Sequence, residues 1–525
     1  MKKSGVISKV LAIALALAMI LSLMPVMSFA AESYPTEGAY VFSFSDSGIT
    51  VVQEGEGGKY KASGTELKIQ AAGTYIVSGS CAEGFIQVSK SVTGVTLVLN
   101  GLTLTNSTTC PLSLNKSTGV TLVVAPGTVN TLTDNAYNND TVYADNAVAE
   151  NAVIKCKDGS QVTICGTGTL NLNAKGERGI KSGAQDIETV PETPRDAWLI
   201  IKEATINITA TAGSGANGGD AIKADQLLKV LSGNLTMAYV DDGLKCDADL
   251  YVGEAGTAGP TINMTKGCEG IEANNIYCYS GDVTINVTTD STGGGGNGIK
   301  ADSTLSIVNG KYTISCNDDA IKSEYYVYIG APCSTEGPTI DIKSSYEGVE
   351  GAHIYIYGGD IKVEASDDAM NAANSDLGTS SPGAPGGRPG SATSSYAFDL
   401  QILGGKIYCN SGGDGIDSNK ALTIRGGESV VLSSKQQDNS ALDVDGTITI
   451  TGGVFLGVSY KGMFSSISNS QYYLTASNQS IRAGQSIWVT DINGDTFAGS
   501  TTTATRSANF IFFTSPELAD FTSRM

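Results

Sequence analysis

Carboxylates recur beside a short apolar motif along the middle of this 525-residue chain. The motif is an acid or polar residue, Gly or Ala, an aliphatic residue, Lys or an acid, and a small residue. Its aliphatic residues are Ile180, Ile222, Leu244, Ile271, Ile299, Ile321, Val349, Met370, Ile416 and Leu442. Two places earlier stand Asp220, Asp242, Glu269, Asn297, Asp319, Glu347, Asp368 and Asp414. Clustered carboxylates with little His or Cys beside them suit a hard, oxygen-preferring cation, and this row therefore predicts Ca²⁺.

The residue after each aliphatic position is usually a lysine, which could neutralise the charge of the acid row, or a further acid. It is Lys at Lys181, Lys223, Lys245, Lys300 and Lys322, and an acid at Glu272, Glu350, Asp417 and Asp443. The predicted metal ligands are Asp241, Asp242, Glu269, Glu272, Asp318, Asp319, Glu347, Glu350, Asp367, Asp368, Asp414 and Asp417. Three interpretations remain open: a solvated charge ladder without an ion, a structural Ca²⁺, and a Ca²⁺ that also contacts ligand.

The spacing of the motif indicates which elements carry it. Successive motifs lie 21 to 28 residues apart, with two longer gaps of 42 and 46 residues, and the intervening short strands alternate apolar and polar residues. Such a period predicts an all-β, right-handed parallel β-helix with about three strands per coil. Equivalent residues of neighbouring coils would lie about 4.8 Å apart, where like unit charges repel by roughly 1 to 3 kcal/mol. An acid row therefore needs neutralisation.

A duplication supports this organisation. Residues 223–282 match residues 300–360, so that Asp242, Lys245 and Glu272 return as Asp319, Lys322 and Glu350. Three coils thus form one larger repeat, in which the polar residues return together with the core. The expected segments are a signal peptide (1–30), an N-terminal cap region (31–91), the β-helix (92–455) with a flexible Gly/Pro loop (375–395), and a C-terminal β cap (456–525).

Composition narrows the functional classes. The basic and apolar start of the chain predicts secretion, with possible retention at the cell surface and no membrane span in the mature chain. Loss of its three Lys would change the formal charge from −20 to −23, which disfavours nucleic acid as a partner. The single His, His353, argues against His-rich metal sites. The ten Cys show no disulfide framework, and Cys278 is expected to be a small buried residue.

Tyrosines form a second candidate surface. The expected inward pairs are Leu228/Val230, Ile276/Cys278, Leu305/Ile307, Ile354/Ile356, Leu422/Ile424 and Ile448/Ile450. Strand alternation then turns Tyr277, Tyr279, Tyr355 and Tyr357 outward, where they could support sugar rings or simply pack against one another. With Lys245, Lys300 and Lys322 they make up the predicted ligand-binding set. Asp491, Asn493 and Asp495 resemble half a calcium loop, but a hairpin turn is the favoured interpretation.

The repeated D-[DG]-[AGI]-[IL]-K and E-G-[IV]-E motifs resemble those of a family of secreted carbohydrate-binding β-helix proteins from plant-degrading anaerobic bacteria. The G-P-T-I turns and the Gly/Pro-rich loop after DDAMNAAN strengthen the resemblance, which covers about residues 92–455. It implies a polysaccharide-lyase-like β-helix, bound Ca²⁺, and binding of cellulose and pectin without established catalysis. Carried over by motif, the calcium candidates are the acids of CEGIEAN, YEGVEGA, DDAMNAA and GDGIDSN.

The favoured function is therefore a secreted, monomeric, non-catalytic protein. It would bind acidic plant cell-wall polysaccharide such as polygalacturonate through Ca²⁺, with cellulose as another ligand. One alternative is a pectate-lyase-like enzyme, in which Ca²⁺ acidifies the proton that a ladder Lys removes. Another is a surface adhesin or spacer whose ladders are only structural.

Overall fold

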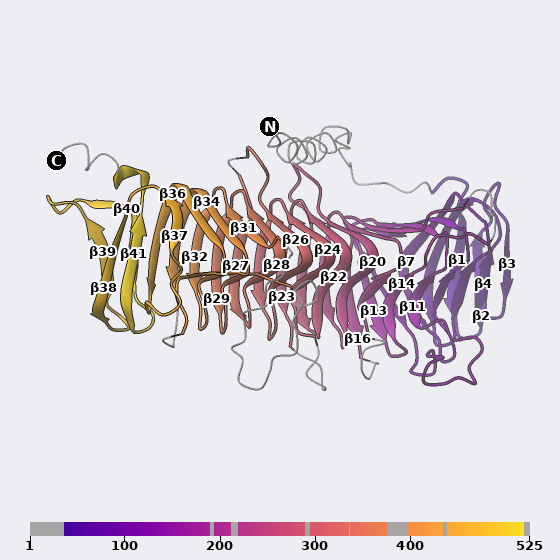
Figure 1. Ribbon diagram of the computed structural model, residues 1–525. Helices are drawn as coiled ribbons and strands as arrows, with labels where there is room; N and C mark the ends of the chain where they lie inside the picture. Colours follow the sequence, from indigo (N-terminus) through magenta and orange to yellow (C-terminus); the bar gives the residue numbers. More distant parts are fainter. Residues whose placement is uncertain are drawn as a thin grey trace.

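The computed structural model describes residues 36–188, 194–211, 219–288, 295–334, 336–374, 397–433 and 438–518. Within them the regular structure is β throughout, apart from a short 3-10 helix, η1 (Pro516–Leu518), so the all-β prediction is confirmed. The predicted signal peptide and Gly/Pro loop lie outside the described residues. None of the described helices is long and apolar enough to cross a membrane. Figure 1 shows the strands side by side along one long axis.

The strands fall into three series, within which neighbours pair in parallel. The first series carries the repeated motif and begins at its N-terminal end with β4 (Glu66–Ile69), β6 (Phe85–Val88) and β8 (Leu112–Leu114). It continues through β11 (Ala152–Cys156), β14 (Arg178–Ser182), β17 (Ile222–Ala224), β20 (Asp242–Val252), β22 (Glu269–Cys278), β24 (Ile299–Ile307), β26 (Ile321–Ile329), β28 (Val349–Ile356), β30 (Met370–Ala372), β33 (Ile416–Ser418) and β35 (Leu442–Val444).

The second series follows the first along the chain within each repeat. It begins with β1 (Tyr40–Ser45) and the first halves of β5 (Gly73–Cys81) and β7 (Val95–Thr105). It then comprises β9 (Gly119–Val124), β12 (Gln161–Cys165), β15 (Trp198–Ile201), β18 (Leu227–Val230), the second halves of β20, β22, β24, β26 and β28, then β31 (Asp399–Ile402), and the first halves of β34 (Ala421–Leu432) and β36 (Thr447–Ser459).

The third series completes each repeat. It comprises the second half of β7, β10 (Val129–Thr133), β13 (Thr169–Ala174), β16 (Thr205–Ala210), β19 (Asn234–Ala238), β21 (Thr261–Lys266), β23 (Asp282–Asn286), β25 (Lys311–Ser315), β27 (Thr339–Ser345), β29 (Asp360–Ala365), β32 (Lys406–Asn410), and the second halves of β34 and β36. Figure 1 shows β13, β16, β23 and β29 along its lower side.

The register follows the motif. The ten aliphatic residues form nine successive in-register pairs, from Ile180 with Ile222 to Ile416 with Leu442. Toward the N-terminus the same row continues through Ile154 and Leu112. The long gaps of 42 and 46 residues therefore interrupt the chain without changing the stacking.

The core lies between the three series. All twelve predicted inward residues, from Leu228 to Ile450, are buried, including Cys278. None of the ten cysteines is in a disulfide, and nine are buried, whereas Cys333 is exposed. One continuous apolar core thus extends along nearly the whole length of the molecule.

Glycine turns hold two neighbouring coils close together, and the duplication repeats them. Gly281 has φ +127°, and a Cβ there would lie 2.9 Å from the Pro260 carbonyl oxygen. Its counterpart Gly359 has φ +111°, and a Cβ would lie 2.7 Å from the Pro338 carbonyl oxygen. Both the backbone conformation and the close approach exclude a side chain.

Antiparallel strands occupy both ends. At the N-terminal end, β2 (Gly48–Gln53) pairs with β1, and β3 (Tyr60–Ser63) pairs with β4. At the C-terminal end β37 (Ile467–Ser470) still pairs in parallel with β36, and it is followed by β38 (Tyr473–Ile481), β39 (Ser486–Thr490), β40 (Thr496–Thr503) and β41 (Ala508–Thr514). Among these, β41 pairs antiparallel with β36 and β38. The turn after β39 is closed by the Asp491 carboxylate, which accepts the Asn493 and Asp495 backbone N–H groups. These contacts are those of a hairpin turn, as the sequence predicted for Asp491, Asn493 and Asp495.

Candidate functional site

The predicted acids recur along the first series, near the N-terminal end of each strand. Asp242 pairs in register with Glu269, and backbone hydrogen bonds beside the other acids continue the row from coil to coil. Asp220, Asp242, Glu269 and Asp319 are all buried. Burial of several carboxylates in one row is costly unless protons, ammonium groups or a metal ion neutralise them.

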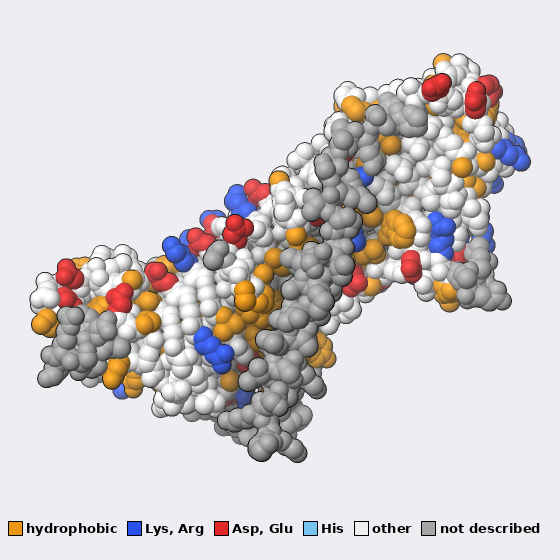
Figure 2. Space-filling model, turned by 90° about the horizontal axis from the view of Figure 1, so that it is seen from above, with side chains coloured by type: hydrophobic (Ala, Val, Ile, Leu, Met, Phe, Trp, Pro, Cys, Tyr) orange, Lys and Arg blue, Asp and Glu red, His pale blue; other side chains and the backbone are white. Residues whose placement is uncertain are grey.

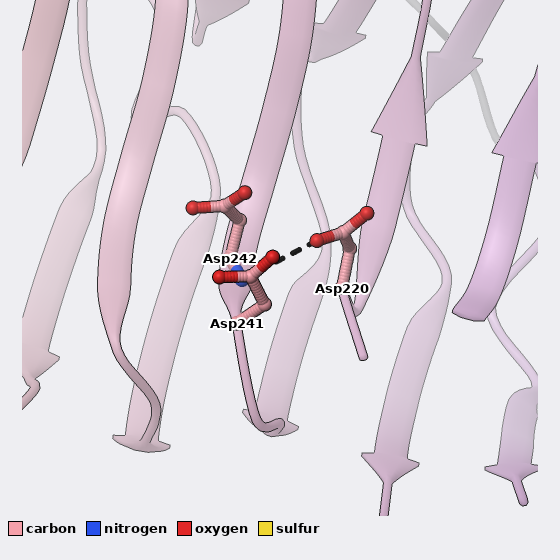
Figure 3. Close-up of side chains that lie close together, drawn as sticks. All are labelled: Asp220, Asp241 and Asp242. Atoms are coloured by element: carbon pink, nitrogen blue, oxygen red, sulfur yellow. Dashed lines mark hydrogen bonds between the residues drawn. The ribbon is translucent and has the colours of Figure 1, made fainter. Parts of the chain in front are cut away.

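Asp220, Asp241 and Asp242 form the first carboxylate cluster, in which an oxygen of each lies within 4.8 Å of the others. Figure 3 shows the three side chains converging from two neighbouring coils, with the Asp242 backbone N–H donating to Asp220 Oδ1 at 3.4 Å. Asp220 also accepts a bond from Arg178 Nε at 2.7 Å. Burial and the Asp220 charge raise the pKa of Asp241 to about 6, and raise that of Asp242 well above its usual range.

One oxygen in this first cluster has no partner. Asp242 is 1 % exposed, and among the described residues its Oδ1 forms no hydrogen bond, although its Oδ2 accepts Lys245 Nζ at 2.8 Å. Ca²⁺ takes roughly six to eight oxygen ligands, and carboxylates from adjacent turns are suitable donors. The donor set therefore fits a Ca²⁺ ion. Asp220 was assigned to the acid row by the sequence but was missing from the predicted ligands, although its row position was a sufficient indication.

Asp319, Glu347 and Glu350 form the second carboxylate cluster, again within 4.8 Å of one another. Glu347 Oε1 accepts Asn371 Nδ2 at 3.0 Å, whereas Oε2 is buried and has no hydrogen-bond partner among the described residues. Burial, followed by the Glu350 and Asp319 charges, raises the pKa of Glu347 to about 9. Burial and Asp319 likewise raise the pKa of Glu350 to about 7. This cluster also fits a hard cation.

Two lysines are already paired with acids, in the same way in each copy of the duplication. Lys245 Nζ lies 2.8 Å from Asp242 and 3.0 Å from Glu272. Lys322 Nζ lies 2.8 Å from Asp319 and also pairs with Glu350. Burial alone would lower the pKa of either lysine, but the carboxylates raise both pKa values above the ordinary range. These ammonium groups therefore mainly balance charge.

Lys300 differs from both of these lysines. It pairs in register with Glu272 on one side and Lys322 on the other, and the place two residues before Ile299 holds Asn297 instead of an acid. Among the described residues Lys300 has no ion pair, because Glu272 is bound to Lys245 and Asp319 to Lys322. Its half-buried ammonium is thus the one predicted ligand-binding lysine open to an external anion.

The remaining predicted acids are arranged differently. Glu269 accepts the Asn297 backbone N–H at 2.9 Å and its Nδ2 at 3.2 Å, and burial raises the pKa of Glu269 to about 7. Asp318 is adjacent to the second cluster, and burial also raises its pKa. Neither residue belongs to a group of three close carboxylates within the part of the chain that the structure describes.

Farther along the row the motif itself supplies no lysine, because the place after the aliphatic residue holds Asn371, Asp417 and Asp443. Asp368 accepts the Asp414 backbone N–H at 2.6 Å, and burial raises the pKa of Asp368 to about 6 and of Asp414 to about 8. Burial and neighbouring Asp charges raise the pKa of Asp417 well above its usual value. Asp367 flanks this set, which includes no three-carboxylate cluster in the described ranges. The predicted ligands in this region are therefore neighbours without forming a compact site.

Of the predicted tyrosines, Tyr277 and Tyr355 lie outward on strands of the second series and stack on neighbouring rings, whereas Tyr279 and Tyr357 follow the ends of β22 and β28. Tyr277 stacks on Tyr251 with centroids 5.0 Å apart, and Tyr355 stacks on Tyr328 at 5.4 Å. A ring so stacked has one face covered by its neighbour, which favours contact with a ligand through ring edges and hydroxyls. No ring–ring contact is recorded for the half-buried Tyr279 and Tyr357 within the described ranges. Figure 2 shows hydrophobic side chains in a band across the middle of one face.

His353 extends this aromatic stack and was not predicted to do so. Its ring lies 5.0 Å from that of Tyr326, and its Nδ1 is hydrogen-bonded to Asp399. Asp399 also accepts the Tyr355 hydroxyl at 3.3 Å. The pairing of β26, β28 and β31 brings these residues together. The outward position of His353 beside a Tyr row was the only sequence indication.

Comparison with known proteins places the chain in a family. The family described as carbohydrate-binding domain-containing protein matches residues 63–332, just over half of the chain, and the chain belongs to it. A carbohydrate-binding domain-containing protein of Acetivibrio thermocellus is 33% identical over 117 residues, which are 22% of this chain and 39% of that relative. A solved structure described as a polysaccharide lyase-like protein from C. thermocellum, in a gadolinium derivative, has 21% identity and a TM-score of 0.29. That match covers 65% of this chain and 98% of the other.

Proposed function

We propose that this protein is a secreted, non-catalytic, Ca²⁺-dependent binder of acidic plant cell-wall polysaccharide such as polygalacturonate. In this proposal residues 92–455 form a right-handed parallel β-helix, because three series of parallel strands recur in each repeat and such crossovers are right-handed. Residues 31–91 and 456–525 cap it, and residues 1–30 direct secretion of a monomer. Membership of a carbohydrate-binding family agrees with the binding role.

The observation that carries the proposal is the unpartnered Asp242 Oδ1 inside the first carboxylate cluster. An uncompensated buried carboxylate oxygen is expensive, whereas coordination to Ca²⁺ satisfies it. The second carboxylate cluster also contains a buried carboxylate oxygen without a hydrogen-bond partner among the described residues, Glu347 Oε2. Two such positions on one row support cation binding more strongly than acidity alone.

Calcium also resolves how an acidic protein binds an acidic glycan. With a formal charge of −20 the chain repels polygalacturonate, and Ca²⁺ held by the row would attract the uronate carboxylates. Lys300 lies in the coil between Glu272 and Lys322 and forms no ion pair with a described residue, although the Glu269 and Glu272 charges lie near it. We assign it as a direct partner for a ligand carboxylate, and the outward tyrosines as lateral contacts.

Lys300 is also the residue that would serve as the base if the protein were a lyase. β-Elimination needs a cation at the uronate carboxylate and a base for the adjacent proton, and an unpaired Lys beside a carboxylate cluster is suited to that task. Binding and catalysis make different predictions for Lys300→Arg. A binder keeps most of its affinity because the positive charge persists, whereas a lyase should change its rate of product formation, because guanidinium differs from an amine in pKa and in geometry.

The test combines retention and product formation. The mature protein is passed through polygalacturonate-containing gels with Ca²⁺ and then with chelator, while ultraviolet absorbance reports unsaturated products. We expect Ca²⁺-dependent retention without product, reduced retention for Asp242→Asn, and unchanged retention for Asp282→Asn, which alters an acid of the third series. Growing absorbance would establish the lyase. Absence of both effects would leave an adhesin or spacer.

A further inference from the structure

Asn–Gly pairs are positions at which an asparagine side chain can react with its own backbone. The backbone nitrogen of the glycine attacks the side-chain carbonyl carbon, and glycine permits the approach because it has no side chain. The sequence contains five such pairs, which begin at Asn100, Asn217, Asn297, Asn309 and Asn493. Asn217 lies outside the described residues. The hydrogen bonds around the other four differ, and these differences determine which pair is open to reaction.

The corner between β24 and β25 holds Asn309 and Gly310 in contact through the atoms that would react. The Gly310 backbone N–H donates to Asn309 Oδ1 at 2.8 Å, which brings the nitrogen close to the carbon that carries this oxygen. Gly310 has φ +108°, and a Cβ there would lie 2.9 Å from the Gly281 carbonyl oxygen. Only glycine therefore fits the corner, and the approach to the asparagine side chain is built into the fold.

Contacts on both sides fix this corner and leave the amide free to depart. The Tyr312 hydroxyl donates to the Asn309 backbone carbonyl oxygen at 3.0 Å, and the Lys311 N–H donates to the Gly281 carbonyl oxygen at 2.8 Å. The Asn309 Nδ2 atom, which would leave as ammonia, forms no hydrogen bond to another described residue. Asn309 is only half-buried, so water reaches it. The geometry thus favours a near-attack arrangement with an open path for solvent.

The pair at Asn297 is arranged in the opposite way. Asn297 is 4 % exposed, and its Nδ2 donates to Glu269 Oε1 at 3.2 Å. The N–H of the glycine that follows donates to the Asp319 carbonyl oxygen at 2.9 Å. Both the nucleophile and the leaving group are therefore held by other partners, and water is excluded.

The two remaining pairs also have their glycine N–H groups engaged elsewhere. The glycine after Asn100 donates to Oδ1 of the buried Asn130 at 2.9 Å. The glycine after Asn493 donates to the Asp491 carbonyl oxygen at 3.2 Å, and Asn493 Nδ2 donates to Asp491 Oδ2 at 3.0 Å. Among the described pairs, only that of Asn309 joins the glycine nitrogen to the side chain of its own asparagine.

We propose that Asn309 is a site of spontaneous deamidation in the folded protein. The Gly310 nitrogen gives its proton to solvent base and forms a bond to Asn309 Cγ, and the bond from Cγ to Nδ2 breaks with release of ammonia. Water then opens the cyclic imide at one of its two carbonyl carbons, which leaves aspartate or isoaspartate at this position. The reaction replaces one amide by one carboxylate, and its only reagent is water.

The product changes the corner in two ways. A carboxylate appears two residues before Lys311, whose Nζ pairs with Asp282 at 3.2 Å, so the new charge competes for this lysine. Isoaspartate in addition inserts a methylene group into the main chain, where the coils at Gly281 and Gly310 are already in close contact. Deamidation therefore makes the protein more acidic by one charge and loosens one corner. Neither effect depends on calcium or on a glycan.

The test follows each Asn–Gly pair by peptide mass after incubation of the folded protein at mildly alkaline pH. Trypsin releases residues 301–311 as one peptide, because Lys300 and Lys311 flank it, and Asn309 is its single asparagine. Deamidation raises the peptide mass by about 1 Da. Incubation in water enriched in heavy oxygen labels the product and distinguishes it from deamidation during digestion. A parallel incubation in urea gives the rates without tertiary structure.

We expect Asn309 to react about tenfold faster in the folded protein than Asn100, Asn297 or Asn493, because only its glycine nitrogen is in contact with the side chain of the same pair. In urea the four rates should converge, since each asparagine precedes a glycine and the hydrogen bonds are lost. Folded Asn309 that reacts no faster than the other three would overturn the proposal, as would the absence of any reaction there.

A variant supplies a second readout on the intact protein. Asn309→Gln should slow the growth of the acidic form in isoelectric focusing by several-fold, because glutamine cyclises through a larger and less favourable ring. Asn263→Gln is the matched control, because Asn263 is exposed on β21 and precedes methionine, and it should keep the wild-type rate. Circular dichroism and thermal unfolding establish that both variants fold. An acidic form that grows in Asn309→Gln at the wild-type rate would contradict the assignment.

Discussion

Asp242 is a buried carboxylate with one partnered and one unpartnered oxygen, so its role is testable by removing the charge. In Ca²⁺-free buffer, Asp242→Asn should change stability by only about 1 kcal/mol, because loss of the Lys245 pair offsets relief of repulsion with Asp220. Saturating Ca²⁺ should raise the thermal midpoint of the wild type by several degrees, as expected for a ligand of the native state. Saturating Ca²⁺ should raise the thermal midpoint of Asp242→Asn by a much smaller amount.

Asp282→Asn is the control for this prediction, because Asp282 pairs with Lys311 at 3.2 Å on an exposed part of the third series. Its Ca²⁺-induced shift should equal that of the wild type. An undiminished shift in Asp242→Asn would remove the first carboxylate cluster from the list of calcium sites.

Glu347 makes stability depend on pH in a defined direction. Its pKa is raised from 4.5 to about 9 by burial and by Glu350, so the native state retains a proton that the unfolded chain releases. Stability in Ca²⁺-free buffer should therefore fall as pH rises between these two values. Urea midpoints measured from about pH 5 to about pH 9 should decline less steeply in Glu347→Gln. The exposed Glu336→Gln should keep the wild-type slope.

At the scale of elements, the turn glycines determine how closely neighbouring coils approach. Gly359→Ala places a Cβ at φ +111° and 2.7 Å from the Pro338 carbonyl oxygen, so the turn must shift. We expect a loss of about 2 to 4 kcal/mol in unfolding free energy, from strain and contact together. Gly127→Ala is the comparison, because Gly127 has φ +73° but open space around its Cβ. A loss equal to that of Gly127→Ala would show that the close contact contributes nothing.

The C-terminal strands are attached to the repeat partly by one arginine. Arg506 Nη1 donates to Asn410 Oδ1 at 3.1 Å and to the Ser411 carbonyl oxygen, and Thr505 donates to the same Asn410 oxygen at 2.7 Å. Arg506→Ala should therefore loosen residues 456–518 and speed limited proteolysis there by several-fold. Arg482→Ala, at an exposed position, should leave the cleavage rate unchanged.

At the scale of the whole molecule, the thiols report whether the single long core is closed. Nine cysteines are buried and reduced, and Cys333 is exposed at a turn. Titration of the native protein with a thiol reagent should find one fast-reacting group, and titration in denaturant should find ten. Cys333→Ser should abolish the fast reaction, whereas Cys278→Ser should leave it intact. Two or more fast groups in a native wild-type sample would contradict the burial of the core.

The periodicity of the sequence was sufficient to predict the register of the molecule. Ile299 and Ile321 each follow a small residue and precede a lysine, and parallel strands place such equivalent residues side by side. Burial of one face of each strand holds that register, because a slip by one residue would expose the core. The all-β class and the inward pairs could therefore be derived from one chain without any contact information.

Which charges remain unsatisfied was decided only by the tertiary structure. Lys245, Lys300 and Lys322 occupy equivalent motif positions, yet two are bound by carboxylates and Lys300 is not, because Asn297 replaces an acid in its own coil and neighbouring lysines engage the other acids. Likewise Asp220 joins a cluster through the coil next to it. The sequence by itself determined the rows along which side chains repeat. Pairing within a row depends on the reach and burial of each side chain, and these exist only once the coils are stacked.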